Sequence, residues 1–335
     1  MNLSVYDEYS LPLKILGIGQ AVPERIVTSE EIETQCDLPQ GWCLEKLGIQ
    51  ERRWAVSDSQ SSLGAKAAEQ ATANAGIELN EIDLIISVSS GIERYLPNTA
   101  TLIQRRLKID TTGVPCFAMG ASCCGFPMAL NLCASFLSSI RYRTILIVST
   151  DVMSKMLDTS SPEAYTFFGD GAAAVVVSLP KNGEQSAIHN AISTTHANGI
   201  PYLYSIMGLG ALGDLDPEKI GPADLAIKID IDAFHEHGKK HVDELFENLC
   251  RDCDLTDFKL VIPPQAGKVF SEHLSQKIKA ERILNIYDRF GFCSSASIPM
   301  ALYQAVENKQ LERGDLFMML GFGAGLTTAG MIMSY

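Results

Sequence analysis

The feature of this sequence that most restricts its fold is an internal repeat. Gly125–Leu130 in the first half of the chain (GFPMAL) matches Ser297–Leu302 in the second (SIPMAL). Each copy follows a stretch of small residues that contains cysteine, and each opens a helical pattern. Such a repeat predicts two similar units related by an approximate twofold axis, with a site where helix N-termini from the two units meet.

Apolar strands and further helices accompany both copies in the same order. The matched segments are Leu84–Val88 and Leu260–Pro264, then helices at Thr99–Leu107 and Val269–Ala280, then Thr144–Ser149 and Leu316–Leu320, then glycine turns leading into strands within Phe168–Ser178 and Gly321–Ser334. Continuous apolar strands are typical of sheets that are covered on both faces. We therefore predict an α/β fold made of residues 1–180 and 185–335, joined at the polar turn 180–184.

Charge and composition exclude several classes of protein. The net charge is −13, which argues against a nucleic-acid partner because phosphate binding needs a basic surface. An anionic coenzyme or carrier protein would need a local basic patch; the candidates, which could equally be scattered solvated charges, are Arg105, Arg106 and Lys108, or Lys268, Lys277 and Lys279. No stretch approaches the ~20 apolar residues of a spanning helix, and the N-terminus does not read as a signal peptide. Nine cysteines, an odd number, indicate reduced thiols in a cytoplasmic protein with no membrane partner.

Cys123 is the strongest candidate for a catalytic residue. It directly precedes the helix that opens near Gly125, and Pro127 fits the first turn of that helix. A cysteine at a helix N-terminus is close to free N–H groups and to the positive end of the helix dipole, both of which favour the thiolate. The alternative is a small buried apolar cysteine, the more common fate of a free thiol. Its neighbour Cys124 is interpreted as structural.

Two glycine-rich segments are considered as binding motifs, and only one of them is a candidate. A backbone N–H in Phe322–Leu326 could help the N–H of Cys123 to bind a thioester oxyanion, although a tight turn between buried strands explains the same residues. Gly208–Gly213 spells a dinucleotide-binding motif, but no strand leads into it and no helix follows, so we treat the match as chance. It lies in Met207–Asp224, which we expect to be a surface loop.

The sequence offers no convincing resident metal site. His235, His237 and His241 fall on one polar helix, and the i, i+4 spacing of His237 and His241 would suit a metal. No third ligand follows in a known frame, so a solvated helix face is favoured. Cys250 and Cys253 form a lone CxxC without a second pair, which is weak evidence for zinc.

Beyond these motifs, the chain resembles the β-ketoacyl-acyl-carrier-protein synthase III family from about Leu13 to the C-terminus. The stretches that carry the resemblance are Gly48–Arg53, the Cys123 segment, Phe168–Gly171, Gln265–Ala266, Ser294–Pro299 and Gly321–Leu326. The resemblance implies a thiolase fold of five layers, αβαβα, in a homodimer. It also implies an acyl-enzyme on Cys123, an oxyanion hole from the N–H groups of Cys123 and Ala324, and no permanently bound cofactor.

The resemblance also assigns substrate-binding positions. Trp42 matches the aromatic residue that stacks on the adenine of coenzyme A, and Leu96 matches a residue that lines the acyl tunnel of the partner subunit. Two arginines that grip the nucleotide in the family are replaced here by Lys46 and Pro162. The expected substrates are therefore thioesters of coenzyme A or of acyl-carrier protein.

Two departures from the family bear on the reaction. Pro264 stands where the family keeps its catalytic His, and Phe292 stands where it keeps its Asn. In the family these residues donate hydrogen bonds to the malonyl carbonyl during decarboxylation. Neither replacement has a side-chain donor, and losing such a donor costs roughly 10²–10³ in rate. Ordinary malonyl condensation is therefore disfavoured, and the pocket becomes more apolar.

Three functions fit this pattern. The first is an acyltransferase that loads an acyl group onto Cys123 and passes it to another acceptor, with Glu93 of the other subunit as a candidate base. The second is a synthase that condenses acyl-CoA with malonyl-ACP using substitute donors, such as the hydroxyls of Ser294 or Ser295. The third is a non-catalytic subunit that pairs with an intact paralogue in a heterodimer.

Overall fold

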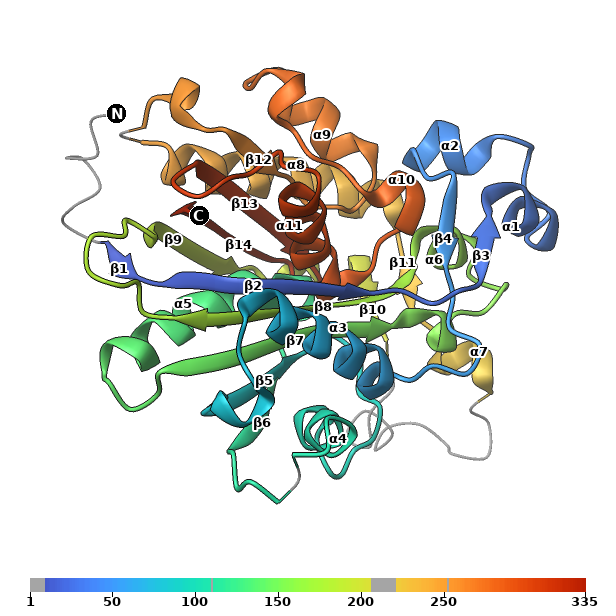
Figure 1. Ribbon diagram of the computed structural model, residues 1–335. Helices are drawn as coiled ribbons and strands as arrows, with labels where there is room; N and C mark the ends of the chain where they lie inside the picture. Colours follow the sequence, from blue (N-terminus) through green and yellow to red (C-terminus); the bar gives the residue numbers. More distant parts are fainter. Residues whose placement is uncertain (1–9, 110, 206–220, 252) are drawn as a thin grey trace.

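Two stacked sheets form the body of the protein (Figure 1). The computed structural model describes residues 10–109, 111–205, 221–251 and 253–335. Within them, the first sheet has the order β2-β8-β7-β5-β6, with bounds Lys14–Ala21, Asp170–Ser178, Thr144–Val152, Leu84–Val88 and Cys116–Met119. The second has the order β1-β9-β14-β13-β12, with bounds Leu11–Pro12, Ala187–Thr195, Thr327–Ser334, Leu316–Gly323 and Leu260–Ile262. Two short strand pairs lie outside these sheets: β3 (Ile26–Thr28) with β4 (Glu51–Arg53), and β10 (Leu203–Tyr204) with β11 (Lys228–Ile229).

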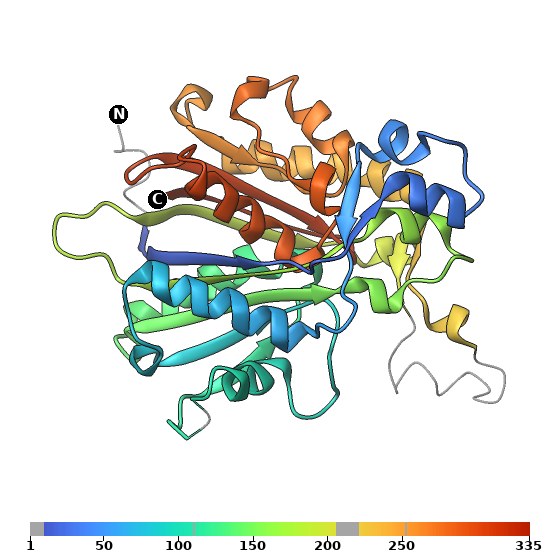
Figure 2. The same ribbon diagram turned by 45° about the vertical axis from the view of Figure 1, so that its right-hand side comes forward.

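Helices cover both outer faces and fill the space between the sheets. In the described residues, α3 (Gln60–Ala75) and α4 (Thr99–Arg106) pack on the first sheet, and α8 (Ile231–Leu249) packs on the second, with α9 (Lys268–Leu274) beside it. Between the sheets lie α5 (Gly125–Ser138) and α11 (Ser297–Glu307) (Figure 2). The result is the expected order of five layers, αβαβα. The shorter helices are α1 (Ser29–Gln35), α2 (Trp42–Leu47), α6 (Pro162–Phe167), α7 (Pro222–Leu225) and α10 (Tyr287–Phe290).

The strands that are apolar throughout the sequence lie in sheets that helices cover on both faces. Along β7, Ile145 and Ile147 face the central layer with α5 and α11, whereas Leu146 and Val148 face α3 and α4. All four side chains are fully buried. Burial contributes about 25 cal/mol per Å² of apolar surface, so a strand buried on both faces anchors two cores at once.

The two sheets repeat one pairing pattern. In the first, β2, β8 and β7 are antiparallel neighbours and β5 runs parallel to β7; in the second, β9, β14, β13 and β12 pair in the same way. The predicted junction at residues 180–184 falls between β8 and β9. One short element crosses over, because β1, near the N-terminus, pairs with β9 of the second sheet.

One local prediction was wrong. The helix expected at Val269–Ala280 ends at Leu274, because the chain turns there and carries Ile278 into the apolar cluster beneath α8. The strand before Cys123 is β6, which lies at the edge of its sheet with its side chains only partly covered. The Gly208–Gly213 motif and most of the expected loop Met207–Asp224 lie outside the described residues.

Candidate active site

Cys123 lies where the first repeat turns from strand to helix. After β6 the chain makes a 3-10 turn, η3 (Ser122–Cys124), which leads directly into α5 with Pro127 in its first turn. Ser122 adopts a left-handed φ of 47° to make this turn. The Cys123 side chain is buried, with 5% of its surface exposed. Gly323 packs directly against it: a Cβ at Gly323 would lie 2.7 Å from the Cys123 Cβ, so this neighbour must lack a side chain.

The second repeat brings a matching turn to the same point. There η10 (Ser294–Ala296) leads into α11, and Ser294 adopts a φ of 52° that mirrors Ser122. The Ser294 hydroxyl lies 3.3 Å from the Cys123 Sγ and 2.6 Å from the Ser90 Oγ. The two helix N-termini therefore meet at the sulfur, as the repeat predicts, and a chain of two hydroxyls approaches it.

The surroundings of Cys123 disfavour its ionisation. Burial raises the pKa of Cys123 to about 11, and the charge of Asp151 adds to this rise. Hydrogen bonds from Ser294, the Ala324 N–H and Ser90 lower the pKa without cancelling the effect of burial. Burial therefore opposes the thiolate that a helix N-terminus favours.

The backbone N–H of Ala324 faces the sulfur. Ala324 lies in the turn between β13 and β14, and its N–H is close enough to hydrogen-bond the Cys123 thiolate. This is one of the two groups predicted to form an oxyanion hole; the other is the N–H of Cys123 itself. A thioester carbonyl held against the sulfur would meet donors that are already oriented, which is the usual large electrostatic contribution to acyl transfer.

Asp151 is a buried acid beneath this site that the sequence analysis missed. One carboxylate oxygen accepts hydrogen bonds from the N–H groups of Ser90 and Gly91, and the other accepts from the N–H and hydroxyl of Ser295, at 2.6–3.0 Å. Burial raises the pKa of Asp151 to about 6, and these hydrogen bonds limit the rise. Asp151 thus ties the loop after β5 to the turn of the second repeat. A charged residue inside the apolar strand β7 was the signal available in the sequence.

A small cavity of about 120 Å³ opens onto the sulfur. Besides Cys123, Ser90, Ser122, Ser294 and Ala324, its lining has the apolar residues Met153, Met156, Phe168, Leu203 and Ile227, together with Tyr204 and Ser205. This composition suits a thioester whose carbonyl lies among donors and whose acyl chain contacts apolar side chains.

Pro264 and Phe292 bring no side-chain donor to this cavity. Phe292 is buried, and its ring packs against those of Phe167 and Phe168 at centroid distances of 4.9 and 5.6 Å. Its backbone pairs with the chain before β8, so the ring is fixed in an aromatic cluster. Pro264 is buried just after β12. Among the described residues, the cavity lining includes neither side chain.

The other predicted substrate-binding residues lie at the periphery. Trp42 begins α2 and is partly buried, and Lys46, on the same helix, forms an ion pair with Asp232 of α8. Leu96 is 79% exposed in the loop after β5. In the same loop, the Glu93 carboxylate accepts hydrogen bonds from the Ser61 N–H and hydroxyl at 2.7 and 3.1 Å, in the first turn of α3. Within this chain Glu93 therefore caps α3, and its action as a base toward a second subunit stays a prediction.

The histidine prediction was partly wrong. His235 does not lie on a solvated face: it is buried, its ring bonds to the Ala266 carbonyl at 2.9 Å, and burial lowers its pKa to about 4. The ring of His237 stacks on that of Tyr202. One candidate basic patch also has acidic partners, because Lys277 pairs with Asp243 and Glu247 and Lys268 pairs with Glu272.

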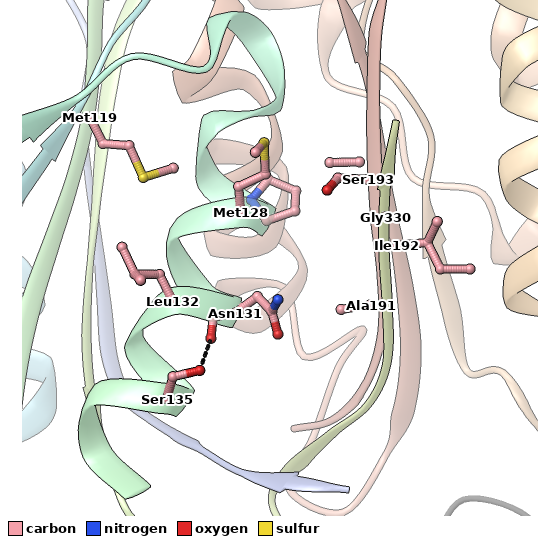
Figure 3. Close-up of a pocket in the computed structure, with 11 residues that line it drawn as sticks. Met119, Met128, Asn131, Leu132, Ser135, Ala191, Ile192, Ser193 and Gly330 are labelled. Atoms are coloured by element: carbon pink, nitrogen blue, oxygen red, sulfur yellow. Dashed lines mark hydrogen bonds between the residues drawn. The ribbon is translucent and has the colours of Figure 1, made fainter. Parts of the chain in front are cut away.

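A second, larger hollow of about 330 Å³ lies between α5 and the second sheet, away from the sulfur (Figure 3). Met128, Asn131 and Ser135 of α5 lie across it from Ala191 and Ser193 of β9, whereas the Ile192 side chain points to the other side of that strand. Leu132 of α5 and Met119 of β6 complete this part of the lining. The described residues that line it include no cysteine and no charged side chain. In the described residues, no helix is both long enough and apolar enough to cross a bilayer.

A buried cysteine at the junction of two repeats, in five layers αβαβα, defines a member of the thiolase fold. Comparison with known proteins narrows this class. Residues 117–196 match the family described as 3-oxoacyl-[acyl-carrier-protein] synthase III, and residues 251–335 match its C-terminal counterpart. The solved 3-oxoacyl-[acyl-carrier-protein] synthase III from Aquifex aeolicus superposes with a TM-score of 0.85 at 28% identity, over 96% of this chain and all of that one.

Curated relatives match over nearly their whole length. The β-ketoacyl-[acyl-carrier-protein] synthase III of Syntrophomonas wolfei is 33% identical over 97% of this chain and 98% of its own. That of Clostridium acetobutylicum is 31% identical over 96% and 98%. The chain belongs to the β-ketoacyl-acyl-carrier-protein synthase III family, which confirms the resemblance found in the sequence.

Proposed function

We propose that this protein is an acyltransferase that takes an acyl group from a coenzyme A or acyl-carrier-protein thioester onto Cys123 and passes it to an acceptor, with malonyl condensation disfavoured. The observation that carries the proposal is a nucleophile and an oxyanion hole without the family's other two donors. The Ala324 N–H is close enough to hydrogen-bond the Cys123 sulfur, which supports the proposal, whereas Pro264 and Phe292 offer no side-chain hydrogen bond.

Acyl capture needs only what lies around the sulfur. The Cys123 sulfur attacks the thioester carbonyl, the oxyanion is held by the N–H groups of Cys123 and Ala324, and the donor leaves as a thiol. Because its surroundings disfavour ionisation of Cys123, the thiol proton must reach the departing sulfur, and the hydroxyls of Ser294 and Ser90 form a path from it. A leaving thiolate needs no strong acid, so the missing His does not prevent this half-reaction.

Decarboxylative condensation would need more. An enolate forms on the malonyl thioester as carbon dioxide leaves, and its oxygen needs hydrogen-bond donors of its own. The oxyanion hole that serves acyl capture does not supply these donors. The side chain of Phe292 has no hydrogen-bond donor, and its ring packs against those of Phe167 and Phe168. Without two such donors the step is expected to slow by roughly 10⁴ or more.

One contact favours a second candidate function, a synthase with substitute donors. The Ser294 hydroxyl lies 3.3 Å from the sulfur and is supported by Ser90, so it could donate to an enolate oxygen. A single neutral hydroxyl replaces at most one of the two missing donors. Condensation through Ser294 is therefore expected to be slow, and the acyl-enzyme remains the main species.

We also propose that the active form is a homodimer. β6 is an open sheet edge, and the loop after β5 exposes Ile92, Tyr95 and Leu96 to 67–79%. The hollow beside β6 in Figure 3 adds apolar side chains of α5 to the same region. An uncovered edge flanked by apolar side chains is typical of a surface that pairs with a second chain. Trp42 and Lys46 are proposed to bind the coenzyme A nucleotide, with Lys46 first released from Asp232.

Intact-mass measurement of the purified protein after incubation with acyl-CoA thioesters of graded chain length tests the proposal. We expect one acyl adduct per chain, absent from Cys123→Ala and retained in Cys124→Ala, the matched neighbour. No adduct with any chain length, or an adduct that persists in Cys123→Ala, would contradict acyl transfer through Cys123. Supplying acyl-carrier-protein thioesters in parallel identifies the donor.

A further inference from the structure

Two histidines and a glutamate meet on the outer side of the second sheet. His196 follows β9 at the start of the 3-10 segment η5 (Ala197–Tyr202), and its ring stacks on that of His241 of α8, with centroids 4.1 Å apart. Glu244 lies one turn further along α8, with its Oε2 3.3 Å from the His241 Nδ1. One ligand atom from each of the three residues lies within 4.8 Å of the others.

We propose that His196, His241 and Glu244 form a binding site for zinc or a similar first-row transition metal. Two imidazoles and one carboxylate are a known three-residue ligand set for zinc, with the fourth position left to water. Bonds of about 2 Å to a shared ion require these ligand atoms to close in by small side-chain rotations. Nitrogen ligands disfavour magnesium and calcium, which prefer oxygen.

The surroundings leave the cluster open to an ion. The histidine rings are partly buried, and half of the Glu244 side chain is exposed, so solvent reaches the carboxylate side. His237, the partner suggested by sequence spacing, is occupied elsewhere because its ring stacks on Tyr202. The two ligands that the sequence spacing did not indicate are therefore Glu244, on the same helix as His241, and His196, from a distant segment.

The cluster is connected to the catalytic turn by the backbone. The His196 N–H donates to the Leu326 carbonyl at 2.7 Å, and Leu326 lies two residues after Ala324. The Thr195 and Thr327 hydroxyls pair at 3.2 Å in the same place. An ion that fixes His196 would thus also restrain the turn that holds Ala324. The metal site itself is independent of the function proposed above.

Thiols are the competing ligands for the same metals. Cys250 and Cys253 lie close together at the C-terminal end of α8, and thiolates bind zinc strongly. Cobalt(II) separates the two sites, because thiolate ligation gives an intense sulfur-to-metal charge-transfer absorption that histidine and carboxylate ligation does not. The probe is therefore Zn²⁺ for affinity and Co²⁺ for ligand type.

Titration calorimetry of the metal-stripped protein with Zn²⁺, in the presence of a reductant that does not bind metal, tests the site. We expect one ion per chain, affinity weakened about tenfold or more by His241→Ala and by His196→Ala, and unchanged affinity in His237→Ala. Co²⁺ should give visible absorption without the sulfur band. Circular dichroism confirms that each variant is folded.

The proposal is overturned by any of three results. These are the absence of stoichiometric binding, binding that survives both His196→Ala and His241→Ala, or a Co²⁺ spectrum with the sulfur band that disappears in Cys250→Ser. Each readout is independent of catalysis, so failure of the acyl-transfer proposal would leave this test intact.

Discussion

The turns Ser122–Cys124 and Ser294–Ala296 share a backbone shape and differ in what they face. Each begins with a serine at a left-handed φ and leads into a central helix. In the first, Cys123 faces the cavity. In the second, the equivalent Ser295 is fully buried and donates to Asp151 at 2.6 Å. One copy of the repeat carries the proposed nucleophile, and the other bonds to the buried Asp151.

That difference explains why the hydroxyls lie near the sulfur. The Asp151 carboxylate accepts hydrogen bonds both from the Ser90 N–H and from the N–H of Ser295, the neighbour of Ser294. It therefore fixes the loop after β5 and the turn before α11. The hydroxyls of Ser90 and Ser294 are then held in line with Cys123. A duplicated fold can thus use one turn for chemistry while the other positions the groups that serve it.

Removing the Asp151 carboxylate should have the largest effect on stability. Asp151→Ala leaves the buried donors of Gly91 and Ser295, and the N–H of Ser90, without their acceptor, which is expected to cost about 3 kcal/mol or more in the free energy of unfolding. Denaturant titration measures this loss. Cys123→Ala, the matched change in the other turn, should cost about 1 kcal/mol, because it removes one small buried atom. Equal losses in the two variants would contradict the division of roles.

The pH dependence of stability follows from the same carboxyl. The pKa of Asp151 rises from 3.8 to about 6 on folding, so its contribution to stability is fully present below 3.8 and is lost as the pH rises to about 6. Unfolding measured across this range should show the decline in the wild type and a flatter curve in Asp151→Asn. A wild-type contribution that grows with pH over this interval would show that the carboxyl is stabilised as an anion.

The rate at which the Cys123 thiol is alkylated should depend steeply on pH. With a pKa of about 11, Cys123 should be alkylated by iodoacetamide about tenfold faster for each pH unit above neutral, without a plateau below about pH 10. Peptide mapping by mass spectrometry follows this cysteine alone. Asp151→Asn should speed the reaction, because the negative charge that raises the pKa is gone. A plateau near pH 8 would show that the thiol is not desolvated.

The smallest effect concerns the hydroxyl that joins the two turns. Ser294→Ala removes a hydrogen bond that lowers the pKa of Cys123, so alkylation and acylation at fixed pH should slow by about tenfold or less. Ser295→Ala serves as the control, since it should lower stability by about 1 kcal/mol and change the rate much less. A larger effect of Ser295→Ala on the rate would reverse the roles given to the two serines.

Much of the fold was predictable because short stretches of sequence identify the strands and helices of each repeat. The strands Leu84–Val88 and Thr144–Ser149 were apolar throughout, and buried strands need such residues on both faces. The position of Cys123 at the start of a central helix was also predictable. The contacts of Ser90 with Ser294 and of Asp151 with Ser295 were not, since they join residues that are far apart in the chain.

The departures from prediction also have physical causes. His235 was assigned to a solvated face because its helix is rich in charge, yet the packing of aromatic rings around it decides its burial. The ionisation of Cys123 was judged from the helix N-terminus alone, whereas burial opposes it and raises the pKa. Neither burial can be read from the residues nearby in sequence.

Measuring both half-reactions in one assay tests the central claim most directly. The protein is given an acyl-CoA and a carboxyl-labelled malonyl thioester, and acyl-enzyme and released carbon dioxide are followed together, with Cys123→Ala as the blank and Pro264→His/Phe292→Asn as the variant with both donors restored. We expect acyl-enzyme on Cys123 with label release close to the blank, and higher release from the double variant. Rapid release of carbon dioxide by the unmodified protein would contradict the account.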